Sequence, residues 1–189
     1  MLKSIFGGQT DAILATLRKV IKANLGEPNF PLEQIRDEFK SNPNRNYALD
    51  DDFIEGLLTS HYESNEAFYV LSLLYPHLDY FNQDFHKDHL HPSSFFRDYN
   101  NITNTFNEED REFCGHMENW NTIPNLQLLN GNLNKSKQDK SLEEWAKANH
   151  ISNDELFVSR DTDLNVSNFR AFIVERKEVL KSKLKSIAS

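Results

Sequence analysis

Two stretches decide the fold of this sequence: Lys87-Asp88-His89-Leu90-His91-Pro92, and the longer run Ile123-Pro124-Asn125-Leu126-Gln127-Leu128-Leu129-Asn130-Gly131-Asn132-Leu133-Asn134-Lys135-Ser136-Lys137. In the first, bulky and polar residues mix over 85–90, which is typical of a short strand, and Pro92 ends it. In the second, residues 123–129 predict another short strand, Gly131 predicts a turn, and residues 132–137 predict a short helix. The predicted order is strand, loop, strand and helix.

Helices are predicted on both sides of these stretches, because apolar residues recur there at helical spacing. The predicted helices cover residues 13–21, 31–39, 54–58, 65–75, 107–119, 142–149 and 167–187. The helix over 65–75 is apolar nearly all round, which favours a buried position. Ser141 and Glu144 form a capping box for the helix that follows them. The Asn- and Thr-rich segment 100–107 and the polar segment 42–46 are expected to be mobile or loop.

The composition is that of a folded protein. The 189 residues, 38% of them hydrophobic and 26% charged, suffice for one domain or one domain with an appendage. Cys114 is the single cysteine, which excludes a disulfide framework and a cysteine-built zinc site. No apolar run reaches the roughly 18 residues of a membrane span, and no signal peptide is recognisable, so a cytoplasmic protein without membrane contact is expected.

The charge is unevenly distributed along the chain. A net charge of −8 argues against a nonspecific nucleic-acid coat, which needs clustered basic residues. Residues 170–189, by contrast, contain six basic and two acidic side chains. Arg176, Lys177, Lys181 and Lys183 fall away from the apolar stripe of this predicted helix. They are expected to form either a solvated helix face or a local surface that meets phosphate.

Taken together, the pattern D-H-x-x-P, N-L-x-L-L and N-x-x-K resembles the HNH (His-Asn-His) nuclease superfamily, whose fold is the ββα-metal or His-Me finger. It is most similar to the C-terminal nuclease region of GmrSD-type modification-dependent restriction proteins. The upstream runs GGQTDAILATLR and LSLLYP also resemble the helical segment that leads into that region. The resemblance implies a mostly α fold, a helical bundle around a two-stranded antiparallel hairpin with a small ββα-metal finger.

The resemblance also implies a role for each motif residue. His89 stands at the position of the general base, and Asp88 at that of the first metal ligand. Asn125 stands where the family has the Asn that orients the catalytic histidine. Asn134, nine residues further on, stands at the position of the second metal ligand. Lys137 matches the basic residue that the family has after the second metal ligand.

These residue types suit phosphodiester hydrolysis. A neutral imidazole near pH 7 accepts the proton of an attacking water, and a carboxylate with an amide oxygen suits Mg²⁺ or Mn²⁺ better than zinc. Neighbouring strand residues point to opposite faces, so Asp88 and His89 serve one site only if the strand end bends near Pro92. His91, Lys135 and Lys137 are the predicted DNA contacts, although packing is an equal expectation for His91.

The sequence departs from the family pattern in two places. Pro124 replaces the usual Gly before Asn125, and Ser93 replaces the Lys that commonly follows Pro92. A zinc site built from His86, His89 and His91 is a weaker alternative, because the pattern supplies no further partners for a tetrahedral ion.

The predicted organisation is a helical lead-in over 1–80, the nuclease core over 81–150 and a helical appendage over 151–189. The predicted function is a metal-dependent DNA endonuclease in restriction or defence against phage. No P-loop pattern occurs, so the nucleotide-hydrolysing domain that accompanies GmrSD-type nucleases is expected on a preceding segment or a separate polypeptide. The alternatives are a noncatalytic nucleic-acid-binding module and a helical protein-interaction domain.

Overall fold

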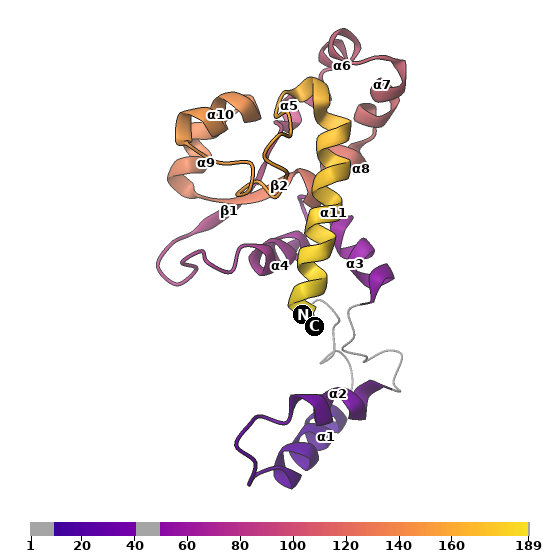
Figure 1. Cartoon of the computed structure of the whole chain (residues 1–189), viewed down its shortest axis with the longest axis vertical. Coiled ribbons are helices and arrows are strands. Elements are labelled where there is room, and N and C mark those ends of the chain that lie inside the picture. The colour runs from indigo at the N-terminus through magenta and orange to yellow at the C-terminus, as the bar shows by residue number, and fades with distance from the viewer. Residues whose placement is uncertain (1–9, 41–49, 189) are drawn as a thin grey trace. The chain divides into compact units, whose positions relative to one another are not determined.

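A two-stranded antiparallel sheet is present in the computed structural model, which describes residues 10–40 and 50–188 (Figure 1). Strand β1 (Phe85–His89) pairs with β2 (Leu126–Asn130) so that Asp88 lies opposite Gln127 and His89 opposite Leu126. Helix α9 (Gly131–Lys137) follows β2 directly and is capped by the Asn130 side chain, which accepts a hydrogen bond from the Leu133 N–H at 2.9 Å. The predicted hairpin and the short helix after it are confirmed.

The segment before β2 corrects one prediction. Residues Ile123–Asn125 form a single 3-10 turn rather than the first part of the strand. Pro124 explains the difference, because its ring fixes φ and its nitrogen cannot donate to a strand partner. The carbonyl oxygens of Ile123 and Pro124 accept hydrogen bonds from the guanidinium of Arg176 instead.

Most of the predicted helices are confirmed. Besides α9, the helices from residue 51 to residue 188 are α3 (Asp51–Leu58), α4 (Asn65–Leu74), α5 (Ser93–Arg97), α6 (Tyr99–Thr105), α7 (Glu108–Gly115), α8 (Met117–Trp120), α10 (Leu142–Asn149) and α11 (Phe169–Ala188), with a 3-10 turn over Val166–Asn168. Helices α5 and α6 were not predicted. The expectation of a mobile segment over 100–107 was wrong, because α6 forms there with Ile102 buried, and Phe106 just after it is buried too. The helix predicted over 107–119 is divided into α7 and α8 at His116, whose backbone is extended.

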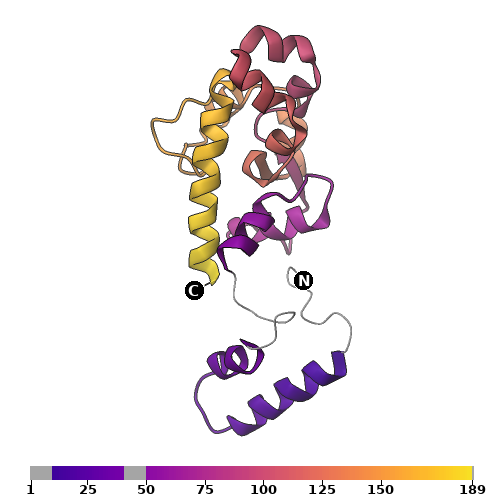
Figure 2. The ribbon, with the colours of Figure 1, turned by 90° about the vertical axis from the view of Figure 1, so that its right-hand side faces the viewer.

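An aromatic core holds this part of the chain together. Phe169 and Phe172 of α11 and Trp145 of α10 are fully or almost fully buried in one hydrophobic cluster. Helix α11 runs along one side of it and packs against α3, α4, α7 and the 3-10 turn before β2 (Figure 2). Residues 169–188 are therefore part of the core of this unit, and the helix is more than an appendage to it.

Arg176 of α11 corrects another prediction. It was expected to face solvent or phosphate, but its side chain is fully buried. Its guanidinium donates hydrogen bonds to the carbonyl oxygens of Leu156, Ile123, Pro124 and Leu126, and to the Tyr75 hydroxyl, at 2.7–3.2 Å. The arginine thus donates to two carbonyl oxygens of the 3-10 turn and to those of Leu126 and Leu156, which helps to satisfy these buried acceptors.

The chain divides into two compact units, Met1–Asp50 and Asp51–Ser189. In the first, α1 (Thr10–Ala23) and α2 (Leu32–Lys40) bury Ile13, Val20, Ile35 and Phe39 against one another. The predicted loop 42–46 lies outside the described residues. Helices α3 and α4 belong with the hairpin, so the observed boundary differs from the division expected at residue 80. No described helix is long and apolar enough to cross a membrane.

Candidate functional site

His89 ends strand β1 and lies in a pocket of aromatic and amide side chains. Its side chain is 9% exposed. The Tyr62 ring stacks on the imidazole with 4.6 Å between ring centroids and 24° between planes, and the Trp120 ring lies tilted at 6.3 Å. The imidazole is thereby held in one orientation at the point where the strand ends.

Asn121 makes the one hydrogen bond that the described residues provide to this imidazole. The His89 Nε2 atom lies 2.8 Å from the Asn121 Oδ1 atom. The Asn121 amide nitrogen donates to both carboxylate oxygens of Glu63, at 2.9 and 3.2 Å. A carboxylate only accepts hydrogen bonds, so the amide nitrogen must face Glu63 and the amide oxygen must face His89. The neutral imidazole therefore carries its proton on Nε2, and Nδ1 keeps the lone pair.

The pKa shifts of His89 and Glu63 favour a neutral imidazole and an ionised carboxylate. Burial lowers the pKa of His89, against the opposing effects of the Asn121 hydrogen bond and the Asp88 charge. The imidazole is consequently neutral near pH 7 and can accept a proton. Hydrogen bonding from its own backbone N–H, with the Asn121 amide, lowers the pKa of Glu63, which stays a carboxylate.

Backbone contacts around Tyr62 hold Glu63 and Asn121 in position. His61 and Thr122 form an isolated antiparallel bridge, and the Tyr62 N–H donates to the Asn121 carbonyl oxygen at 2.9 Å. Lys87 of β1 donates from Nζ to the Ser64 carbonyl oxygen at 2.6 Å. Residues 61–64 are thus tied both to the chain around Asn121 and to β1.

Asn125 makes no hydrogen bond to the His89 ring, which corrects the role predicted for it. Its amide oxygen accepts from the His91 N–H at 3.0 Å, and its amide nitrogen donates to the carbonyl oxygens of His91 and Trp120, at 3.0 and 2.8 Å. Fully buried, Asn125 fixes the backbone that leaves β1 after His89. The direct orienting contact belongs to Asn121.

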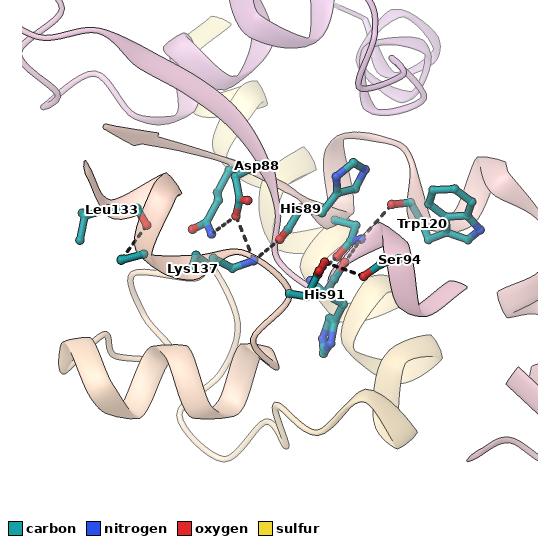
Figure 3. A network of polar contacts seen from close by, with 11 residues as sticks. Asp88, His89, His91, Ser94, Trp120, Leu133 and Lys137 are labelled. Carbon is teal, nitrogen blue, oxygen red and sulfur yellow. Dashed lines mark hydrogen bonds and ion pairs between the residues drawn. The ribbon is translucent and has the colours of Figure 1, made fainter. Parts of the chain in front are cut away.

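Asp88 pairs with the ammonium group of Lys137. The Oδ2 atom of Asp88 accepts hydrogen bonds from Lys137 Nζ and Gln127 Nε2, both at 3.0 Å (Figure 3). Lys137 Nζ also donates to the His89 carbonyl oxygen. Burial lowers the pKa of Lys137, and the charge of Asp88 opposes this shift. Lys137 is fully buried, so the prediction that it contacts DNA directly was wrong.

The side chains of Asp88 and His89 leave β1 on opposite sides (Figure 3). This follows the alternation of side chains along a strand. The two groups remain close enough for the Asp88 charge to raise the pKa of His89. The bend that was expected to bring both side chains to one face lies beyond them, where the chain passes from Leu90 to Pro92.

The predicted metal ligands present a small set of oxygen donors. The described residues give no hydrogen bond to Asp88 Oδ1 and none to the half-buried side chain of Asn134 on α9. Within residues 10–40 and 50–188, no group of three or more His, Cys, Asp or Glu side chains is placed to hold a metal ion. Asp88 and Asn134 supply a carboxylate and an amide oxygen, which are ligand types that hard divalent ions accept.

His91 is buried and packs against α11. Its ring lies at 5.4 Å from the Phe169 ring and 4.8 Å from the Phe172 ring, edge-on to both, and is 1% exposed. Burial, with the charges of Lys137 and Arg176, lowers the pKa of His91 to about 3. Of the two expectations for His91, packing is confirmed and DNA contact was wrong. With His91 in the aromatic core, the zinc alternative loses one of its three ligands.

Other basic groups differ in their accessibility. Lys135 of α9 is exposed, as a DNA contact requires. Arg97 at the end of α5 is also exposed, and its charge contributes to the low pKa of His89. Lys177 and Lys181 both pair with Glu55, and Lys185 pairs with Asp51.

Sequence reasoning missed Asn121, Glu63 and Tyr62. The chain contains 21 asparagines, so no single one attracts attention without a motif. Glu63 and Tyr62 lie 26 and 27 residues before His89, outside both diagnostic stretches. The bridge between His61 and Thr122 places Tyr62 and Glu63 next to Asn121, and no sequence pattern predicts this pairing.

Compared with known protein families, the chain matches no family model, and no curated protein matches it significantly.

Proposed function

We propose that this protein is a metal-dependent endonuclease of the HNH type that hydrolyses DNA phosphodiester bonds, with the hairpin and α9 as its ββα-metal finger. The observation that carries the proposal is the neutral imidazole of His89, with its proton held on Nε2 and its lone pair left on Nδ1. A buried amide and a carboxylate behind an imidazole are the arrangement by which a general base is oriented.

In the proposed reaction, His89 Nδ1 removes a proton from water. The water oxygen forms a bond to phosphorus, the bond from phosphorus to the 3′ oxygen breaks, and that oxygen takes a proton from solvent. Asn121 holds the imidazole while it becomes an imidazolium, and the Glu63 carboxylate stabilises the added charge through the Asn121 amide. Asn125 keeps the backbone next to His89 in place.

Asp88 and Asn134 would hold the Mg²⁺ or Mn²⁺ ion. When bound, such an ion would neutralise the charge that develops on the phosphate and on the leaving oxygen. Because Lys137 already pairs with Asp88, we expect weak metal binding in the absence of substrate phosphate.

The biological part of the proposal rests on the family resemblance alone. We propose that the nuclease cleaves modified or phage DNA in the cytoplasm. It would act with a nucleotide-hydrolysing domain or subunit.

One observation favours a second candidate, a noncatalytic nucleic-acid-binding module. The ammonium of Lys137 lies 3.0 Å from the proposed metal-binding carboxylate and can take the place of the cation. A protein that kept the finger only as a scaffold would be stabilised by this pair without any metal.

Plasmid cleavage separates these candidates. Supercoiled DNA is incubated with the protein in Mg²⁺, Mn²⁺ or EDTA, and His89→Ala is compared with His116→Ala, a substitution at an exposed histidine just before α8 whose side chain makes no capping hydrogen bond. We expect metal-dependent cleavage that His89→Ala reduces on the order of 10²–10⁴-fold and His116→Ala leaves unchanged. DNA binding without cleavage in any metal would favour the noncatalytic module, and equal cleavage by both variants would reject His89 as the base.

A further inference from the structure

Arg97 lies at the end of α5 with its guanidinium group exposed. Its guanidinium carbon is 5.9 Å from the centroid of the Trp120 ring, and the described residues give it no hydrogen bond or ion pair. The exposed carboxylate of the neighbouring Asp98 instead accepts from the Asn100 N–H and caps α6. Arg97 therefore keeps all its donors available for a group from outside the chain.

The other arginines of residues 51–188 are engaged within the protein. Arg111 and Arg176 donate to backbone carbonyl oxygens. Arg160 pairs with Asp154, and Arg170 pairs with Glu109 and Asp110. Arg97 is the exception among these five, and packing on an aromatic ring is the contact that holds it.

Arg97 and His89 both lie beside the Trp120 ring. Trp120 lies near both residues, at 5.9 Å from the Arg97 guanidinium carbon and 6.3 Å from the His89 ring centroid. The Arg97 guanidinium and the proposed general base thus have the Trp120 ring as a shared neighbour.

We propose that Arg97 binds the non-bridging oxygens of the phosphodiester that the water activated by His89 attacks. This inference rests on the proposed function and adds a substrate contact to it. A guanidinium presents its donors as a planar fork that matches two phosphate oxygens, and a phosphate held there would lie near the imidazole. Arg97 would also offset, at the site itself, the net charge of −8 that repels DNA.

The experiment compares Arg97→Ala and Arg97→Lys with Arg160→Ala, the matched control at an exposed arginine paired with Asp154. Binding of a short DNA duplex is measured by fluorescence anisotropy over a range of salt concentrations, in the His89→Ala background so that no cleavage occurs. Single-turnover cleavage is measured separately with an intact His89.

We expect Arg97→Ala to reduce the slope of log affinity against log salt by about 0.9, the value for one phosphate contact. We expect it to slow cleavage on the order of 10²-fold. Arg97→Lys retains the charge and so the slope, but it slows cleavage because the fork is lost. Arg160→Ala changes neither quantity.

An unchanged slope and rate for Arg97→Ala, in a protein that cleaves DNA, would overturn the role of Arg97 and leave the proposed function intact. A wild-type protein that neither binds nor cleaves DNA would overturn both. Wild-type binding without cleavage, together with the reduced slope for Arg97→Ala, would reject the nuclease while supporting the phosphate contact.

Discussion

The orientation of one amide, that of Asn121, determines which nitrogen of His89 accepts a proton. The hydrogen bonds from its amide nitrogen to Glu63 leave only the oxygen for His89. In the proposed reaction this side chain would act through the histidine, without contacting the DNA.

We expect Asn121→Ala to lower the rate of cleavage by about 10–100-fold, the usual range for a residue that orients a functional group. DNA affinity should remain unchanged, because no phosphate contact is lost. Single-turnover kinetics and anisotropy binding measure the two quantities, with Asn132→Ala, at an exposed position on α9, as the control. A parallel loss of rate and affinity would contradict an orienting role.

His91 makes the stability of the fold sensitive to acid. Its pKa is about 3 in the folded protein and near 6.5 in the unfolded chain, and its Nε2 atom is buried with no hydrogen bond. Above pH 6.5 both states hold a neutral ring, so His91 contributes no pH dependence. Between pH 6.5 and 3 the unfolded chain binds a proton that the folded protein does not, so stability falls as pH falls.

We therefore expect His91→Leu to flatten the acid side of the stability profile. The free energy of unfolding of wild type should contain a contribution that decreases by about 1.4 kcal/mol per pH unit in this window, and the variant should lack it. Urea unfolding at several pH values between 4 and 8 provides the measurement. The same acid slope in wild type and variant would contradict the prediction, and His116→Leu, at an exposed site, controls for loss of a histidine.

At the scale of elements, α11 completes the segment before β2. Arg176 donates to the Ile123 and Pro124 carbonyl oxygens of the 3-10 turn over Ile123–Asn125. The hydroxyl of Tyr75, just after α4, adds a fifth partner to the guanidinium. One side chain thus connects α11 to the residues that precede the hairpin.

We expect Arg176→Leu to destabilise the protein by about 3–5 kcal/mol, because several buried carbonyl oxygens lose their donors at once. Arg176→Lys should recover only part of this loss, since an ammonium cannot reach all these oxygens as a planar fork does. Tyr75→Phe, which removes one partner, should cost far less. Chemical denaturation of the three variants tests this order, and an Arg176→Lys variant as stable as wild type would contradict it.

Local sequence patterns predicted several elements of the fold. Alternation and Pro92 were enough to predict β1, helical spacing was enough for α4, and the capping box was enough for α10. Sequence predicted His89 and Asp88 only through their motif. The burial of Arg176 and Lys137 was not predictable, because basic residues on helices are usually exposed. The carbonyl oxygens that accept hydrogen bonds from these two side chains belong to segments distant in the sequence.

At the scale of the whole molecule, the basic residues of α11 serve internal contacts. Lys177 and Lys181 pair with Glu55 of α3, and the pKa of Glu55 falls to about 2 because both lysines donate hydrogen bonds to it. Lys185 pairs with Asp51. The local excess of positive charge in this helix is therefore largely matched by carboxylates of α3.

We expect the combined replacement of Lys177, Lys181 and Lys185 by Ala to leave the salt dependence of DNA binding unchanged and to lower stability slightly. The exposed Lys135→Ala should instead reduce the salt slope by about 0.9. Anisotropy titrations over a range of salt concentrations measure both effects. A reduced slope for the triple variant would show that this face of α11 binds phosphate after all.

The place of Arg176 late in the chain affects when the proposed site forms during translation. His89, Asn121 and Asn125 leave the ribosome well before α11, but the Arg176 guanidinium that donates to the carbonyl oxygens of Ile123, Pro124 and Leu126 is synthesised later. The nascent polypeptide therefore contains the residues of the proposed site before the arginine that helps to position their backbone has been synthesised. If the protein has the proposed nuclease function, its site would be complete only after α11 has been synthesised, and unfinished chains would cleave DNA poorly.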